Sequence, residues 1–140
     1  MKATRSIGIL REGKNKWERR VAITPSEVKK LVDRNIRVLI EPCERRVFKD
    51  LDYQQAGAII TNDLSSSSFI IGVKDIPSNK LFDNHSYLNF PHVIKGQPAN
   101  MPFLDECLSK KIRLFDYECI KDPNTKLRTV AFGTFYIFHL

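Results

Sequence analysis

The chain has 140 residues, which suits one domain with a buried core and is too short for two ordinary domains. Hydrophobic residues make up 42% of it and charged residues 28%, a balance typical of globular proteins rather than disordered or fibrous ones. The net charge of +7 comes from lysines and arginines scattered along the sequence. They form no basic tail and no known nucleic-acid module, so we expect no nucleic-acid partner.

The first half of the sequence alternates short apolar runs with helical patterns. Strands are predicted at residues 6–10, 36–40 and 58–60, and a short helix at 50–56, stopped by Gly57. A longer helix has the clearest start. Thr24 can cap it, Pro25 occupies its first turn, and Glu27 completes a capping box.

The second half predicts strands at residues 69–73, 87–90, 112–115 and 127–132. A helix is expected within residues 99–111, on an apolar stripe of Met101, Leu104, Cys107 and Leu108. Strands alternating with helices predict an α/β domain over residues 1–140, Rossmann-like or flavodoxin-like. Its three layers would be a mostly parallel sheet with helices on both faces.

Three cysteines, Cys43, Cys107 and Cys119, lie far apart without a CxxC pair. This spacing predicts neither a disulfide framework nor a structural zinc site, and it favours the cytosol or the mitochondrial matrix. No apolar run approaches the roughly 20 residues that span a membrane, so no membrane association is expected. Residues 1–5 resemble neither a secretion signal nor a clear transit peptide.

Charged side chains follow three of the predicted strands. Lys74 follows one, His92 and Lys95 follow the next, and Asp116 and Glu118 follow a third. Arg19 and Arg20 lie in the loop after the first strand. Because ligands of open α/β sheets bind outside the carboxyl ends of the strands, we expect these groups to meet at one edge.

Such a set suits proton transfer on a carboxylate substrate. A lysine and a histidine can exchange protons near neutral pH, and arginine grips a carboxylate with two parallel hydrogen bonds. A purely structural interpretation stays open for each residue. Lys74 could be a solvated strand end, His92 a turn residue, and Arg20 a surface charge paired with Glu12 or Glu18.

Several segments, in order, resemble the N-terminal domain of the alanine dehydrogenase and transhydrogenase family. They resemble most its saccharopine-forming branch, the lysine-ketoglutarate reductases. These segments are KWERRVAITPSEVKKL (16–31), IIGVKDIP (70–77), YLNFPHVIKGQ (87–97), NMPFLDE (100–106), IRLFDYE (112–118) and RTVAFG (128–133). The resemblance covers residues 6 to about 135.

The resemblance implies an oxidoreductase of lysine breakdown that joins lysine to 2-oxoglutarate and reduces the imine to saccharopine with NADPH. It implies that Lys74 and His92 are the catalytic acid–base pair. Arg20 and Lys95 match carboxylate-binding positions, and Arg128 is a candidate for the same anion-rich cleft. Glu118 matches an acidic residue that tunes the lysine. The animal relatives imply mitochondria, and the plant relatives imply cytosol.

No G-x-G-x-x-G fingerprint occurs in the sequence. We therefore expect the cofactor-binding domain to be absent, NADP(H) to belong to a longer parent, and this chain alone to bind no cofactor and be inactive. An apolar patch left uncovered would favour a homo-oligomer or association with the full-length enzyme. The alternative interpretation is a non-catalytic binding or regulatory module that binds a dicarboxylate or pairs with that enzyme.

Overall fold

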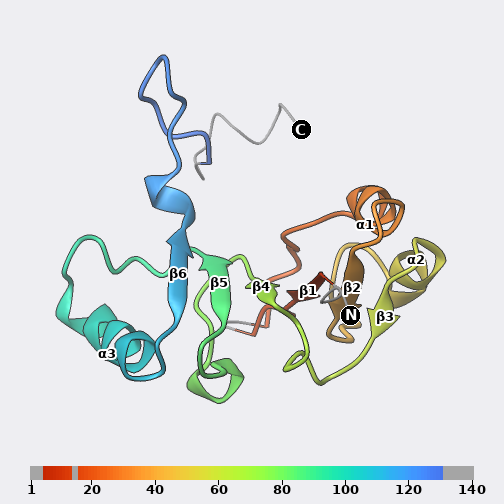
Figure 1. Cartoon of the computed structure of the whole chain (residues 1–140), viewed down its shortest axis with the longest axis horizontal. Helices are drawn as coiled ribbons and strands as arrows, with labels where there is room; N and C mark the ends of the chain where they lie inside the picture. The colour runs from red at the N-terminus through yellow and green to blue at the C-terminus, as the bar shows by residue number, and fades with distance from the viewer. Residues whose placement is uncertain (1–4, 14–15, 131–140) are drawn as a thin grey trace.

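The computed structural model describes residues 5–13 and 16–130. Figure 1 shows a six-stranded sheet, with α1 and α2 beside β2 and β3 and with α3 near β6. In chain order the elements are β1 (Ser6–Ile9), α1 (Pro25–Val32), β2 (Arg37–Ile40), α2 (Asp50–Gln55), β3 (Ile59–Ile60), β4 (Phe69–Ile71), η1 (Ser78–Lys80), β5 (Ser86–Asn89), η2 (Pro98–Asn100), α3 (Met101–Ser109), β6 (Arg113–Asp116) and η3 (Tyr117–Cys119).

The strands follow the order β3-β2-β1-β4-β5-β6, and every neighbouring pair is parallel. The strand order reverses between β1 and β4, which is the switch point of a doubly wound Rossmann-like sheet. The predicted α/β class is therefore confirmed. The sheet is wholly parallel in the described residues rather than mostly so.

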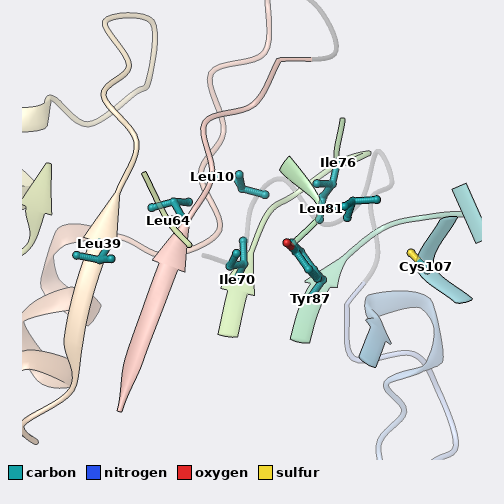
Figure 2. Close-up of a cluster of buried hydrophobic side chains, with 8 residues drawn as sticks. All are labelled: Leu10, Leu39, Leu64, Ile70, Ile76, Leu81, Tyr87 and Cys107. Atoms are coloured by element: carbon teal, nitrogen blue, oxygen red, sulfur yellow. The ribbon is translucent and has the colours of Figure 1, made fainter. Parts of the chain in front are cut away.

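Two hydrophobic clusters cover opposite faces of the sheet. In β2, Val38 and Ile40 join a cluster with Val28 of α1 and Tyr53 of α2. The residue between them, Leu39, points to the other face and joins the cluster drawn in Figure 2, which reaches Cys107 of α3. Side chains alternate between faces along a strand, so α1 and α2 form one layer and α3 forms the opposite one.

The predicted start of α1 is confirmed. The backbone N–H of Thr24 donates to the Glu27 carboxylate over 3.0 Å, and Pro25 is the first helical residue. The short helix α2 ends as predicted, because Gly57 adopts a left-handed conformation with φ of +94° just after it. Both signals are local in sequence, which is why the sequence predicts them.

The strand predicted at residues 127–132 is wrong where the structure describes it. Leu127 is 70% exposed, and Arg128 forms only an isolated bridge with Lys121. Between these residues, Asp122 Oδ1 accepts the N–H groups of Asn124 and Thr125 and closes a turn. This segment extends beyond the sheet at the end of β6 in Figure 1, where none of the described strands lies beside it. Residues 131 and 132 lie outside the described part.

The face of β4, β5 and β6 that lies opposite α3 carries an open apolar hollow of about 410 Å³. Phe69, Leu88, Phe115 and Ile120 line it, and the rings of Phe69 and Phe115 lie 5.5 Å apart. Phe115 is 49% exposed and Ile120 41% exposed. An apolar patch of the expected kind is thus present on this part of the sheet.

Among the helices in residues 5–13 and 16–130, none is both long enough and apolar enough to cross a membrane.

We expect Gly57→Ala to lower the free energy of unfolding by about 1–2 kcal/mol, because an L-residue is strained at this φ. A Cβ atom there would also lie 2.9 Å from Val32 Cγ1. Urea denaturation would measure the change. Gly13→Ala is the matched control, since its Cβ would meet no heavy atom within 4 Å. Equal stability of the two variants would contradict this account of the end of α2.

Candidate functional site

The charged residues predicted from the sequence lie at the carboxyl edge of the sheet. Lys74 follows β4, His92 follows β5 and Glu118 follows β6 within η3. These three strands are neighbours. The loop between β1 and α1, which contains Arg20, begins at the same edge. The structure divides these residues into two groups of contacts.

The first group surrounds Glu118, which is only 7% exposed. Its Oε2 lies 3.2 Å from His92 Nδ1, while its Oε1 lies 3.5 Å from Lys95 Nζ and 3.4 Å from Arg128 Nη1. A single buried carboxylate therefore gathers three basic side chains, two from the loop after β5 and one from the segment after η3. Lys95 and Arg128 each keep 52% of their side chain exposed, so both can also reach a ligand.

Electrostatics and local backbone geometry fix Glu118. Burial raises its pKa, but the hydrogen bond with His92 and the charge of Lys95 outweigh burial, so the net shift is downward. The Glu118 N–H donates to Asp116 Oδ1 over 2.8 Å, which holds the turn after β6. The carboxylate is thus kept in its charged form beside the three basic groups.

His92 has a left-handed backbone, with φ of +54°. Histidine tolerates this region better than most residues, but the conformation still costs energy and needs support. Asn100 supplies it, because its Nδ2 donates to the His92 carbonyl over 3.0 Å. The imidazole Nδ1 faces Glu118, which leaves Nε2 as the ring nitrogen available to a ligand.

The second group surrounds Lys74 and Arg20. The Lys74 N–H donates to Glu12 Oε2 over 3.0 Å, and the Lys74 carbonyl accepts from Asn89 Nδ2 over 3.2 Å. Arg20 donates to Glu18 through Nε over 2.7 Å and through Nη2 over 2.5 Å. The charge of Lys74 acts on Glu18 as well, so Glu18 lies within electrostatic reach of both basic residues.

The Arg20 hydrogen bonds hold the pKa of Glu18 at about 2, and the charges of Arg20 and Lys74 add to this effect. Arg20 therefore has a carboxylate partner, which was one of the structural interpretations weighed for it. Because 45% of its side chain remains exposed, the guanidinium can still contact solvent or a ligand while it holds Glu18.

Tyr117 is the neighbour of Glu118 in the first group, and Glu12 of the second group acts on it electrostatically. It precedes Glu118 in the chain, and its ring lies 4.8 Å from that of Phe90. Burial raises the pKa of Tyr117 to about 12, and the negative charge of Glu12 adds to the rise. The phenol therefore stays neutral at physiological pH.

Within residues 5–13 and 16–130, no three His, Cys, Asp or Glu side chains are grouped so that they could hold a metal ion. The described residues also fit a dinucleotide poorly. In a Rossmann sheet the turn after the first strand binds pyrophosphate through glycine N–H groups. Here that turn contains the buried carboxylate of Glu12, which would repel a phosphate.

The sequence did not single out Glu12 and Asn89 as site residues. The sequence offers Glu12 only as a partner for the arginines of its loop, and it predicts Asn89 within a strand. A weak signal exists for Asn89, since an amide stands between the apolar residues Leu88 and Phe90 of a predicted strand. No signal could connect Glu12 with Lys74, because they are 62 residues apart in the sequence.

Known proteins resemble this chain over most of its length. Residues 8–135 match the family model described as alanine dehydrogenase/PNT, N-terminal domain. A Bos taurus protein, "Alpha-aminoadipic semialdehyde synthase, mitochondrial", is 43% identical over 127 residues. A Candida glabrata protein, "Saccharopine dehydrogenase [NAD(+), L-lysine-forming]", is 33% identical over 122 residues.

The match covers 91% of this chain but 14% of the Bos taurus protein, and 83% of this chain but 32% of the Candida glabrata protein. A solved structure of an L-alanine dehydrogenase superposes with a TM-score of 0.68, 23% identity and coverage of 85% of this chain and 34% of that chain. At this identity the superposition supports the fold alone, and it agrees with the doubly wound sheet.

We expect the Glu18 carboxyl to titrate near pH 2 in carbon-detected NMR and to move toward 4.5 in Arg20→Ala. A carboxyl group whose pKa is lowered in the folded state stabilises that state above about pH 4.5. This stabilisation is lost as the pH falls toward 2. The stability lost in Arg20→Ala should therefore be largest at neutral pH, at roughly 1 kcal/mol for a half-exposed partner.

Arg19→Ala is the control for this titration. Arg19 donates to the Arg45 carbonyl rather than to Glu18, so its removal should leave the Glu18 titration unchanged. A Glu18 midpoint near 4.5 in the unmodified chain would contradict the assigned ion pair.

Proposed function

We propose that this chain forms the substrate side of an oxidoreductase of lysine breakdown. The chain belongs to the alanine dehydrogenase/PNT N-terminal domain family. The reaction joins the ε-amine of lysine to the keto group of 2-oxoglutarate and reduces the resulting imine to saccharopine. The similarity to alpha-aminoadipic semialdehyde synthases and saccharopine dehydrogenases supports this proposal. The chain spans only a small part of those relatives, so the activity of the whole protein is part of the proposal.

One observation carries the proposal at the level of chemistry. A lysine and a histidine follow adjacent strands of one sheet edge, and each has a carboxylate within reach. His92 is held by Glu118 through Nδ1, so Nε2 is the atom we assign to proton transfer. We assign the companion role to the ammonium or amine of Lys74.

The condensation needs an acid and a base at each stage. The amine nitrogen attacks the keto carbon, loses a proton, and the former carbonyl oxygen gains one, which gives a carbinolamine. Its hydroxyl then leaves as water after taking a second proton, and a carbon–nitrogen double bond remains. We propose that Lys74 and His92 exchange these protons. The carbon–nitrogen double bond is then reduced by a hydride, which a nicotinamide would supply. None of the described residues is assigned to that step.

The substrate carboxylates need cations, and Arg20, Lys95 and Arg128 are the proposed partners. All three already contact Glu18 or Glu118, yet each remains about half exposed. A substrate carboxylate would therefore share these cations with the internal carboxylates. Glu118, beside His92, Lys95 and Arg128, is the proposed regulator of charge in the site.

NADPH is the proposed reductant, although the name of the Candida glabrata relative specifies NAD(+). The mitochondrial matrix is the proposed compartment, because the Bos taurus relative is named as mitochondrial. The cytosol is the alternative compartment. Lysine and 2-oxoglutarate are the proposed small-molecule partners.

A second candidate function is a non-catalytic binding module that pairs with another copy of this domain. The open apolar face around Phe69, Leu88 and Phe115 favours it, since patches of this kind often mark association sites. Sedimentation velocity would test it. Concentration-dependent dimers that Phe115→Ser abolishes would support this candidate, and a monomer at all concentrations would count against it.

The binding of 2-oxoglutarate by the 140-residue chain tests the leading proposal. Trp17 is the single tryptophan and stands beside Glu18, so its fluorescence should report occupancy. We expect Arg128→Gln and Lys74→Met each to weaken binding by roughly tenfold, the effect of losing one charged hydrogen bond. Glutarate, which differs from 2-oxoglutarate only in lacking the keto group, should be less sensitive to Lys74→Met than 2-oxoglutarate.

The control is Arg37→Gln, because Arg37 stands exposed at the amino end of β2, on the opposite edge of the sheet. It should bind 2-oxoglutarate as the unmodified chain does. An equal loss in Arg37→Gln would show that only general surface charge matters and would remove the assigned site.

A further inference from the structure

We propose that Glu12, in the loop after β1, and Asn89, in β5, are positioning residues. Their side chains hold the main chain of Lys74 by hydrogen bonds from both sides, and we call this arrangement the grip. The inference rests on the role proposed above for Lys74, but it concerns different residues and a different part of Lys74. It assigns the orientation of that lysine to two side chains that touch its backbone and not its amine.

Glu12 grips from the side of β1. Its Oε1 accepts the Val73 N–H over 2.7 Å, and its Oε2 accepts the Lys74 N–H over 3.0 Å. Both carboxylate oxygens are thus engaged by consecutive main-chain groups. Glu12 is only 6% exposed, so these two bonds are shielded from water. Hydrogen bonds to a charged acceptor are strong in such a shielded place.

The ladder between β1 and β4 explains why a side chain is needed at this place. Its last backbone bond runs from the Leu10 N–H to the Ile71 carbonyl. Past that point the two chains separate, and the next N–H groups of the β4 chain have no strand carbonyl on this side. The Glu12 carboxylate replaces the missing ladder for Val73 and Lys74.

Asn89 grips from the side of β5. It is fully buried, and its Nδ2 donates to the Lys74 carbonyl over 3.2 Å. The backbone ladder on this side ends with the Phe90 N–H on the Val73 carbonyl. Lys74 is therefore the first residue beyond both ladders, and side chains from β5 and from the loop after β1 take both of its main-chain polar groups.

This arrangement differs from an ordinary strand end. A strand end that serves only stability can leave its last polar groups to water at little cost. Here a carboxylate is buried to hold two amides, which costs desolvation energy, and the residue so held carries the proposed catalytic amine. Burial raises the pKa of Glu12, and the two backbone N–H groups oppose that rise. The grip thus depends on those two N–H donors.

Amide hydrogen exchange in the 140-residue chain tests the grip directly. In Glu12→Gln the side chain keeps its shape but offers one acceptor oxygen, so exchange at Val73 and Lys74 should accelerate by roughly tenfold or more. Their amide protons should also move upfield, because the short bond to a carboxylate is lost. The Leu10 amide, bonded to the Ile71 carbonyl, should keep its exchange rate.

The functional readout is the dissociation constant for 2-oxoglutarate, followed through Trp17 fluorescence. Glu12→Gln and Asn89→Leu should each raise it by about tenfold, because a misplaced Lys74 would lose its own charged hydrogen bond to the ligand. Asp50→Asn is the matched control, since Asp50 also accepts a backbone N–H at this edge, that of Cys43 over 3.1 Å. Its dissociation constant should not change.

Unchanged exchange at Val73 and Lys74 in Glu12→Gln would overturn the grip. If exchange at Leu10 in Glu12→Gln accelerated as much as exchange at Val73 and Lys74, the grip would also be overturned, since only global stability would then have changed. Failure of the unmodified chain to bind 2-oxoglutarate would instead remove the proposed function. In that case the exchange rates alone would decide whether Glu12 and Asn89 hold Lys74.

Discussion

The carboxyl edge of this sheet depends on one physical constraint, the main-chain N–H groups left over where parallel strands diverge. Buried carboxylates satisfy several of them. Glu12 takes those of Val73 and Lys74, and Glu41 at the end of β2 takes that of Arg11 over 3.0 Å. Glu41 also meets the ammonium of Lys80 from η1. The loops after β1, β2 and β4 are thereby fastened to one another by side chains rather than by strands.

These carboxylates determine how the surplus of positive charge is distributed. A buried carboxylate is costly unless hydrogen bonds or cations compensate it. Glu118 and Glu18 are compensated by basic side chains, of which Arg20 and Arg128 remain about half exposed. The internal carboxylates therefore hold these cations in place at the edge. An anionic ligand needs to compete with these internal carboxylates, which favours a ligand carrying more than one carboxylate.

The sequence predicts features whose cause is local and misses those whose cause is distant. The capping box of α1 and the glycine after α2 were predicted because a few adjacent residues determine them. The residues that follow β4, β5 and β6 were predicted because strand ends of a parallel sheet share one edge. The strand predicted at residues 127–132 failed over its described residues, 127–130, because an apolar run does not reveal whether a neighbouring strand exists. The contact of Glu12 with Lys74 could not be predicted, since nothing within either segment records the other.

The strand order gives this distant contact its significance. The order reverses between β1 and β4, and at such a switch point the connections leave toward opposite faces and open a crevice. Glu12 follows β1 and Lys74 follows β4, so the Glu12 carboxylate spans the mouth of that crevice. In a dinucleotide-binding sheet, glycine N–H groups at this turn donate hydrogen bonds to a phosphate. Here a carboxylate faces inward and accepts N–H groups from the neighbouring strand. The same topological position is thus used with opposite polarity, because here the side chain accepts hydrogen bonds where a nucleotide-binding turn donates them.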